Sequence, residues 1–186
     1  MAEISQVNKN ILKAAEKFKD KLAKIKVCIF DIDGILTDGT ITYDEALDGY
    51  NRTFNIVDGY GLKILMNNGI KVGVVSGGDS KAVRKRFTEN LKVDFWFLGN
   101  LDKRGAYLEI LQMGYTDEEI LFMGDEFIDL PVLERVGFSV SVPMASYEIQ
   151  EAVDYITHYH GGHGAVREIC DIVRIAKNLN AKVEGF

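Results

Sequence analysis

The sequence predicts an α/β fold, a Rossmann-like arrangement of three layers in which helices cover both faces of a parallel sheet. Two observations predict it: from residue 25 onward short apolar runs alternate with segments of helical spacing, and several of those runs are followed directly by polar residues. The gaps between the runs are too short for a second domain, so we expect the 186-residue chain to lack a large cap domain.

Five apolar runs have the length and composition of buried strands. They cover residues 25–30, 70–75, 95–97, 120–123 and 138–142. Segments with helical spacing lie between them, at residues 58–67, 80–90, 103–113 and 129–136. Asn68-Gly69 and Met113-Gly114 lie at the ends of two of these segments, and a glycine after the last periodic residue is typical of a helix end.

One segment interrupts the alternation just after the first strand. Residues 40–43 and 52–55 are strand-like, and residues 44–51 between them are rich in turn formers. We therefore expect a β-hairpin that projects over the carboxyl edge of the sheet, where open α/β folds bind ligands.

Residues 1–24 are predicted to form an amphipathic helix, because apolar residues such as Ile4, Val7 and Ile11 recur at helical spacing and lysines occupy much of the rest. A packed helix with a solvated basic face is favoured over a membrane-surface helix, and an oligomerisation or partner-docking arm is the other alternative. The expected organisation is this helix, one domain over residues 25–178, and a tail over residues 179–186.

The overall composition argues against several classes of protein. The net charge of −6 disfavours a nucleic-acid-binding protein, which usually carries a basic face. Cys28 and Cys170 form no pattern typical of disulfides or zinc sites. The sequence shows no signal peptide and no apolar run of membrane-spanning length. We expect a cytoplasmic protein that works without nucleic acid or membrane.

Polar residues at four strand ends have the composition of a phosphoryl-transfer site. Asp31, Ser76 and Asp125 directly follow or end strands, and Lys103 comes shortly after another. The carboxyl ends of parallel strands share one edge of the sheet, so these residues should converge. Each residue alone is a weak signal, but the four together in this order indicate a common site.

Each of these residues suits one part of a phosphatase mechanism. Asp31 is the expected nucleophile, a carboxylate that takes the phosphoryl group as an aspartyl-phosphate. Asp33 is placed to give a proton to the leaving oxygen and later to accept one from the attacking water. The charge of Lys103, the Ser76 hydroxyl and the closely approaching backbone at Gly77 would stabilise the phosphoryl oxygens.

Magnesium is the expected cofactor, because it prefers oxygen ligands and usually takes only a few of them from protein. The sequence offers Asp31, Asp33 and Asp125 as its ligands. Glu126 and Asp129 are expected to act from further out, Asp129 by fixing the catalytic lysine or the waters of the metal.

These residues resemble the motifs of the haloacid dehalogenase superfamily of phosphatases. Residues 31–37 look like its first motif, Ser76 like the second, Lys103 like the third, and Gly124-Asp125 with Asp129 like the fourth. The aspartate two residues after the nucleophile favours a phosphatase, because a dehalogenase needs no acid at that position.

Four longer segments resemble the family of 3-deoxy-D-manno-octulosonate (Kdo) 8-phosphate phosphatases and its nonulosonate 9-phosphate relatives. They are residues 31–39, 54–61, 124–133 and 161–168, within a resemblance over about residues 25–178. The resemblance implies a capless fold and a homotetramer assembled by the hairpins. It also implies that a neighbouring subunit's hairpin and the glycine-rich tail help to close the site.

The resemblance implies that Arg167 contacts the substrate or the closed loop, whereas the residues alone equally allow an ion pair with Glu168 or Asp171. Two positions depart from the family pattern. Gly78 stands where the family typically carries an arginine, and Glu126 stands where a second aspartate is usual.

The expected reaction is hydrolysis of a small anionic sugar phosphate, Kdo 8-phosphate first, in lipopolysaccharide biosynthesis. Nonulosonate 9-phosphates or a broader set of sugar phosphates are the alternatives. A phospho-receiver domain and a non-catalytic oligomerisation module are less favoured, because a receiver needs no acid at Asp33 and the catalytic set is intact.

Overall fold

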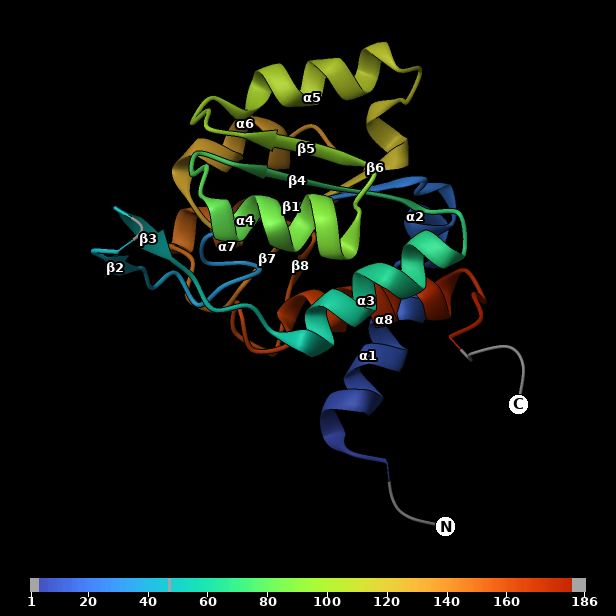
Figure 1. The fold of residues 1–186 in the computed structure, drawn as a ribbon. Coiled ribbons are helices and arrows are strands. Elements are labelled where there is room, and N and C mark those ends of the chain that lie inside the picture. Colours follow the sequence, from blue (N-terminus) through green and yellow to red (C-terminus); the bar gives the residue numbers. More distant parts are fainter. Residues whose placement is uncertain (1–3, 47, 182–186) are drawn as a thin grey trace.

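The computed structural model describes residues 4–46 and 48–181. Its centre is a six-stranded sheet in the order β5-β4-β1-β6-β7-β8, with parallel pairing between neighbouring strands (Figure 1). The strands are β1 (Val27–Asp31), β4 (Lys71–Ser76), β5 (Phe95–Leu98), β6 (Ile120–Met123), β7 (Phe138–Ser141) and β8 (Tyr155–Ile156). The predicted parallel sheet is confirmed, and β8 extends it by a strand that the sequence analysis did not predict.

Helices pack on both faces of this sheet (Figure 1). The first face carries α1 (Gln6–Lys17), α3 (Ile56–Asn67) and α8 (Ala165–Ala176), and the second carries α5 (Lys103–Gln112), α6 (Leu130–Leu133) and α7 (Tyr147–Ala152). Because successive strand side chains point to opposite faces, Cys28 and Phe30 pack under the first set, and Val27 and Ile29 under the second. This is the predicted three-layer architecture.

The N-terminal segment forms two helices instead of the single helix predicted over residues 1–24. α1 is followed by α2 (Lys19–Lys24), and Phe18 between them is not helical. The Phe18 ring packs edge-on against Phe138 and Tyr155, with ring centroids 5.0 and 6.2 Å apart. This aromatic contact anchors the chain on the sheet and explains the break.

The predicted division of the chain into a helix, a domain and a tail stays a prediction. Residues 1–3 of the predicted helix and residues 182–186 of the predicted tail lie outside the described residues. Where the chain is described, α1 and α2 both pack against α8. None of the described helices combines the length and the apolarity that crossing a membrane requires.

The projecting hairpin is present, but its strands differ from those predicted. β2 (Thr42–Asp44) pairs antiparallel with β3 (Gly49–Asn51), so the second strand ends before the predicted residues 52–55. Arg52 turns back toward the end of β1, and Asn55 caps the first turn of α3 with its side chain. Both side chains therefore make contacts that a continued strand would prevent.

Two of the predicted helices are shorter or of another type. Residues 80–90 form α4 (Lys81–Arg84) and then a π-helical segment, Lys85–Leu91. Residues 129–136 begin within a short 3₁₀ turn, Phe127–Asp129, and continue as α6. A second 3₁₀ turn, Asp117–Glu119, precedes β6.

The glycine-rich segment before α8 lies over the loop that follows β1. The backbone N–H of Gly162 donates to the carbonyl of Ile35 at 2.9 Å. Asp58 of α3 is buried and accepts hydrogen bonds from the backbone N–H groups of Gly164, at 3.2 Å, and Arg167, at 2.7 Å. Burial raises the pKa of Asp58, and these two donors act in the opposite direction. Asp58 therefore caps α8, because Gly164 has no side chain to do so.

Candidate active site

Asp31 is the last residue of β1, near the middle of the sheet. Because β1 pairs with both β4 and β6, Ser76 at the end of β4 and Gly124-Asp125 after β6 lie on either side of it. The strand ends therefore converge as the sequence predicts.

Three carboxylates form the centre of the site. Asp31, Asp125 and Asp129 each place an oxygen within 4.8 Å of the others. Asp31 and Asp129 are buried. Oδ2 of Asp129 accepts hydrogen bonds from the backbone N–H groups of Asp125 and Glu126, both at 3.0 Å. Asp129, which the sequence places further out, therefore lies in one cluster with two of the three predicted ligands, Asp31 and Asp125.

Lys103 begins α5 and reaches this cluster from the second face of the sheet. Its side chain is 1 % exposed, and its ammonium lies 2.9 Å from Oδ1 of Asp31 and pairs with Oδ1 of Asp129. Burial by itself lowers the pKa of Lys103, but the two carboxylates raise it on balance, so the side chain stays charged. The predicted phosphate-neutralising cation lies beside the predicted nucleophile.

A single ammonium does not balance the charge of these carboxylates. Burial raises the pKa of Asp31 to about 7, although Lys103 acts in the opposite direction. The pKa of Asp125 rises to about 8, because of burial first and then of Asp31 and Asp129. Oδ1 of Asp125 is buried, and no described residue donates a hydrogen bond to it. A divalent cation that prefers oxygen would satisfy this atom and lower both pKa values, so the donor set fits magnesium.

The turn after β1 brings the backbone against Asp125. Gly34 has a φ of 89°, and a Cβ at this position would lie 2.0 Å from Oδ2 of Asp125. Oγ1 of the buried Thr37 accepts a hydrogen bond from the Gly34 backbone N–H at 3.3 Å and donates one to the carbonyl of Ile32 at 3.3 Å. Glycine is required here both by the conformation and by the close approach.

Ser76, the predicted phosphate ligand, is buried. Its Oγ accepts a hydrogen bond from the backbone N–H of Gly78 at 3.0 Å. A hydroxyl that accepts one hydrogen bond still has its proton to donate, so Ser76 is able to bind a phosphoryl oxygen. Gly77 lies between them in the same turn. The phosphate-binding roles of Ser76 and Gly77 stay predictions.

The carboxylate of Asp33 lies apart from the three clustered carboxylates. Its oxygens accept hydrogen bonds from Nε of Arg52 at 2.5 Å and from Nη2 at 3.0 Å. The prediction that Asp33 is a metal ligand stays a prediction: the guanidinium engages both of its oxygens, and the carboxylates that cluster among the described residues are Asp31, Asp125 and Asp129. The Asp33 side chain is 34 % exposed, and its role in proton transfer stays a prediction.

Arg52 is a residue that sequence reasoning missed. Its place in the strand-like run 52–55 predicts an ordinary hairpin residue, whereas its side chain is only 9 % exposed and pairs with Asp33. The available signal is a cation within a hairpin that is expected over the carboxyl edge of the sheet.

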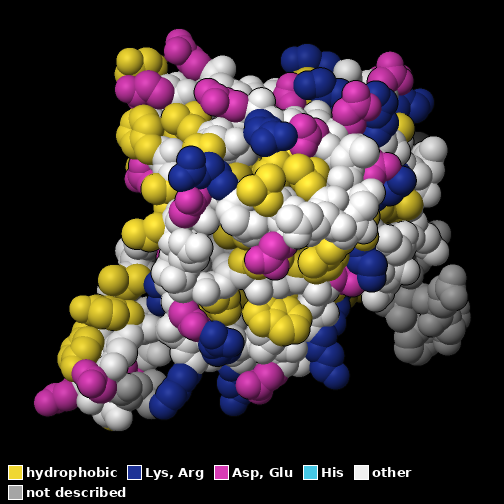
Figure 2. Space-filling view, turned by 90° about the horizontal axis from the view of Figure 1, so that it is seen from above, with side chains coloured by type: hydrophobic (Ala, Val, Ile, Leu, Met, Phe, Trp, Pro, Cys, Tyr) yellow, Lys and Arg dark blue, Asp and Glu magenta, His cyan; other side chains and the backbone are white. Residues whose placement is uncertain are grey.

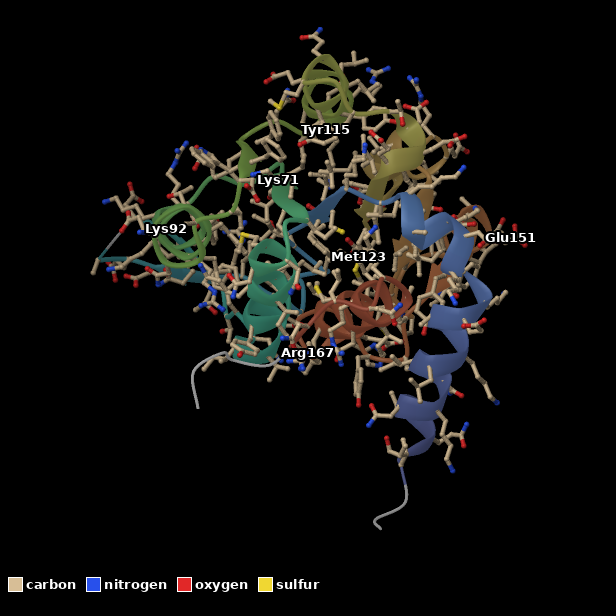
Figure 3. The ribbon with its side chains drawn as sticks, turned by 90° about the vertical axis from the view of Figure 1, so that its right-hand side faces the viewer. Lys71, Lys92, Tyr115, Met123, Glu151 and Arg167 are labelled. Atoms are coloured by element: carbon tan, nitrogen blue, oxygen red, sulfur yellow. The ribbon has the colours of Figure 1, made fainter. Side chains whose placement is uncertain are left out.

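Two further predicted residues make other contacts. Glu126 is exposed, and its Oε1 accepts a hydrogen bond from the Phe127 backbone N–H at 2.7 Å, so it caps the turn that leads to Asp129. Nε of Arg167 pairs with Oδ2 of Asp171 at 2.9 Å on the same helix. Figure 3 shows Arg167 on α8, which packs beside α3. Contact between Arg167 and the substrate stays a prediction.

Comparisons with known proteins agree with this geometry. Residues 97–169 match a family described as haloacid dehalogenase-like hydrolase. The chain is 39 % identical over 172 residues to the 3-deoxy-D-manno-octulosonate 8-phosphate phosphatase KdsC of Haemophilus influenzae. That match covers 90 % of this chain and 94 % of the relative.

Two solved structures are similar over most of the chain. The cobalt-bound form of the deoxy-D-mannose-octulosonate 8-phosphate phosphatase YrbI from Haemophilus influenzae has a TM-score of 0.80 at 39 % identity, covering 85 % of this chain and 92 % of that one. The enzyme of Moraxella catarrhalis, in complex with magnesium ion, phosphate ion and Kdo, has a TM-score of 0.83 at 32 % identity, covering 88 % and 93 %. Sequence, fold and carboxylate cluster agree: the protein belongs to the 3-deoxy-D-manno-octulosonate 8-phosphate phosphatase family of haloacid dehalogenase-like hydrolases.

Proposed function

We propose that this protein hydrolyses Kdo 8-phosphate to Kdo and inorganic phosphate, with magnesium as its cofactor. The observation that carries the proposal is the position of Asp31, a buried carboxylate that lies beside Lys103 and within a cluster suited to a cation. A carboxylate so placed is able to approach a phosphoryl group, because neighbouring cations neutralise the charge of that group. Relatives named for this reaction support the choice of substrate.

In the first step an oxygen of Asp31 bonds to phosphorus, and the bond from phosphorus to the sugar oxygen breaks. Asp33 donates a proton to that departing oxygen. Lys103 and the hydroxyl of Ser76 donate hydrogen bonds to the phosphoryl oxygens. The step leaves the free sugar acid and a phosphorylated Asp31.

In the second step a water molecule attacks the phosphorus of the aspartyl-phosphate. Asp33, now deprotonated, takes the proton of that water, and the bond between phosphorus and Asp31 breaks. Inorganic phosphate leaves, and both aspartates return to their starting states. The same two side chains therefore serve both halves of the reaction, with Lys103 balancing the charge throughout.

Asp31 and Asp125 would hold the magnesium ion, and Asp129 lies close enough to support them. When bound, the ion stabilises negative charge on the phosphoryl oxygens. The pairing of Asp129 with Lys103 and with two backbone N–H groups keeps this part of the site rigid before anything binds.

A phosphate-release screen tests the proposed function. It compares Kdo 8-phosphate, a nonulosonate 9-phosphate and neutral sugar phosphates, with and without a chelator. We expect the highest kcat/KM for Kdo 8-phosphate and no turnover in the chelator. A preference for the nonulosonate would assign the alternative substrate, and a flat profile would contradict a dedicated biosynthetic role.

Magnesium should stabilise the fold more strongly as the pH rises from about 5 to about 8. The pKa values of Asp31 and Asp125, about 7 and about 8, lie above the ordinary value, so the metal-free folded protein binds more protons here than the unfolded chain. These bound protons stabilise the metal-free fold. Their contribution to the free energy of unfolding is fully present below the ordinary pKa. It is lost as the pH rises through the folded-state pKa values, by at most about 1.4 kcal/mol per pH unit and group. A bound cation offsets the loss.

Thermal unfolding with chelator or with magnesium, across this pH range, measures the effect. Asp125→Asn is the matched variant, and it should show both a flatter pH dependence without metal and a smaller stabilisation by magnesium. A magnesium-induced shift in Tm that is the same at both ends of the range would contradict the assignment.

We further propose a homotetramer assembled through the hairpins, in which a neighbour's hairpin and the glycine-rich tail help to close the site. In support, Ile41, Tyr43 and Tyr50 are 52 %, 54 % and 52 % exposed. Figure 2 shows hydrophobic side chains along the projecting arm at its lower left. Such exposed apolar surface marks interaction sites. A stable monomer in light scattering would refute the assembly.

We also propose that the protein is cytoplasmic, and cell fractionation tests this location.

A further inference from the structure

Gly78 lies against a side chain that comes from a different part of the chain. A Cβ at this position would lie 2.7 Å from Nη2 of Arg52 and 3.3 Å from Oδ2 of Asp33. The guanidinium of Arg52 therefore lies where a side chain at position 78 would begin. The resemblance to the family implies an arginine at this position, and in this chain a guanidinium lies there that comes from Arg52.

Arg52 holds Asp33 with only part of its hydrogen-bonding capacity. Nε and Nη2 donate to the two Asp33 oxygens at 2.5 and 3.0 Å. A guanidinium has five N–H groups in a planar fork, and no described residue other than Asp33 accepts a hydrogen bond from that of Arg52. The two N–H groups of Nη1 and the second N–H of Nη2 therefore remain. One N–H from each of these two nitrogens can bind a second carboxylate with two parallel hydrogen bonds.

Arg52 and Gly78 also line a pocket of about 370 Å³, within the range of roughly 300–1,000 Å³ that is typical of small-molecule sites. Its walls are residues 48–52 of the hairpin and residues 78–82. Asp79 in this wall is paired with Arg84, at 2.7 and 2.5 Å, and Lys81 adds an exposed ammonium. The wall of residues 78–82 therefore combines an acid that is paired with Arg84 and one exposed cation, Lys81, and the hairpin wall contributes Arg52 and Asp48.

The order of these groups follows the expected path of a substrate. In the proposed mechanism the phosphoryl group would lie at Asp31 and its leaving oxygen at Asp33. Because Asp33 is paired with Arg52, and Arg52 lines the pocket, the sugar would extend into that pocket. We propose that Arg52 determines specificity by binding the carboxylate of a keto-sugar acid in this pocket. This inference rests on the proposed function and assigns to Arg52 the contact with an anionic sugar that an arginine at position 78 would make.

The test measures kcat and KM of Arg52→Gln on Kdo 8-phosphate and on a neutral sugar phosphate. The ratio of kcat/KM for Kdo 8-phosphate to kcat/KM for the neutral sugar phosphate should fall about ten- to hundredfold, the effect of losing a charge-assisted hydrogen bond. Most of this change should be a rise in KM for Kdo 8-phosphate. Free Kdo should also inhibit hydrolysis of the neutral sugar phosphate less strongly, by a similar factor. Arg135→Gln, which removes an exposed arginine paired with Asp117, should leave the preference unchanged.

A double variant makes the test independent of any general damage to the hairpin. Arg52→Gln with Gly78→Arg should recover much of the preference, because the second substitution returns a guanidinium beside the same pocket. Gly78→Arg alone should weaken binding, because its side chain collides with Arg52. Arg52→Gln variants that unfold like wild type but lose activity equally on both substrates would overturn the inference.

The outcomes separate this inference from the proposed function. A wild-type protein without preference for acidic sugar phosphates would contradict both. A wild-type preference for Kdo 8-phosphate that survives Arg52→Gln unchanged would overturn the role of Arg52 and leave the proposed function standing.

Discussion

Replacing Asp31 with asparagine is expected to lower kcat on the order of 10⁴-fold or more, because an amide does not attack phosphorus. The neighbouring carboxylates are poorly placed to substitute for it. Both oxygens of Asp129 already accept hydrogen bonds, and Asp125 lies against the backbone at Gly34. Phosphate release from Kdo 8-phosphate at saturating magnesium measures the loss.

The same variant also separates lost chemistry from a lost fold. Asparagine has almost the shape of aspartate, and it removes a carboxylate whose pKa burial raises to about 7. The metal-free variant should therefore lose less stability than wild type as the pH rises through that value. Asp102→Asn is the control, because Asp102 is exposed and asparagine caps a helix as well as aspartate does. Activity within about tenfold of wild type would refute Asp31 as the nucleophile.

The convergence of the catalytic residues is predictable from sequence, because it follows from the geometry of a parallel sheet. A fully apolar run such as the one that leads to Asp31 is typical of a central strand. The strands on either side of it, β4 and β6, bring Ser76 and Asp125 to the same edge of the sheet. Lys103 follows the same logic from the start of α5.

Residues that act across the fold are not predictable in this way. Asp58 lies in the first turn of α3 and looks like a cap for that helix, yet it caps α8, which follows more than a hundred residues later. Arg52 looks like part of a strand until the hairpin is seen to end at Asn51 and the chain to turn back to Asp33. Hydrophobic periodicity carries no information about such polar contacts between distant segments, since it reports only which face of an element is buried.

Replacing Lys103 with methionine is expected to abolish turnover and to destabilise the metal-free protein by about 3–5 kcal/mol near pH 8, the effect of removing one partner from a buried ion pair. Lys103 pairs with both Asp31 and Asp129, and all three side chains are at most 8 % exposed. Methionine has a similar length and fills much of the same space, so the loss is one of charge and not of packing.

The size of this loss should depend on pH, which distinguishes it from a packing defect. Lys103 acts to lower the pKa of Asp31, so its removal raises that pKa further above about 7. A raised folded-state pKa gives stability at low pH that is lost as the pH rises through it. The deficit of Lys103→Met in urea unfolding should therefore be smallest near pH 5 and largest near pH 8.

Two further variants complete the test of this charge balance. Lys26→Met removes an ammonium that is 64 % exposed and paired with Glu119 at the surface, so it should unfold close to wild type at both pH values. Adding Asp129→Asn to Lys103→Met should recover stability near pH 8, because one unpaired buried charge disappears, while turnover stays absent because the phosphoryl oxygens still lack their cation. A deficit of equal size at both pH values, or one that Asp129→Asn does not reduce, would show that Lys103 serves the site by packing and not by its charge.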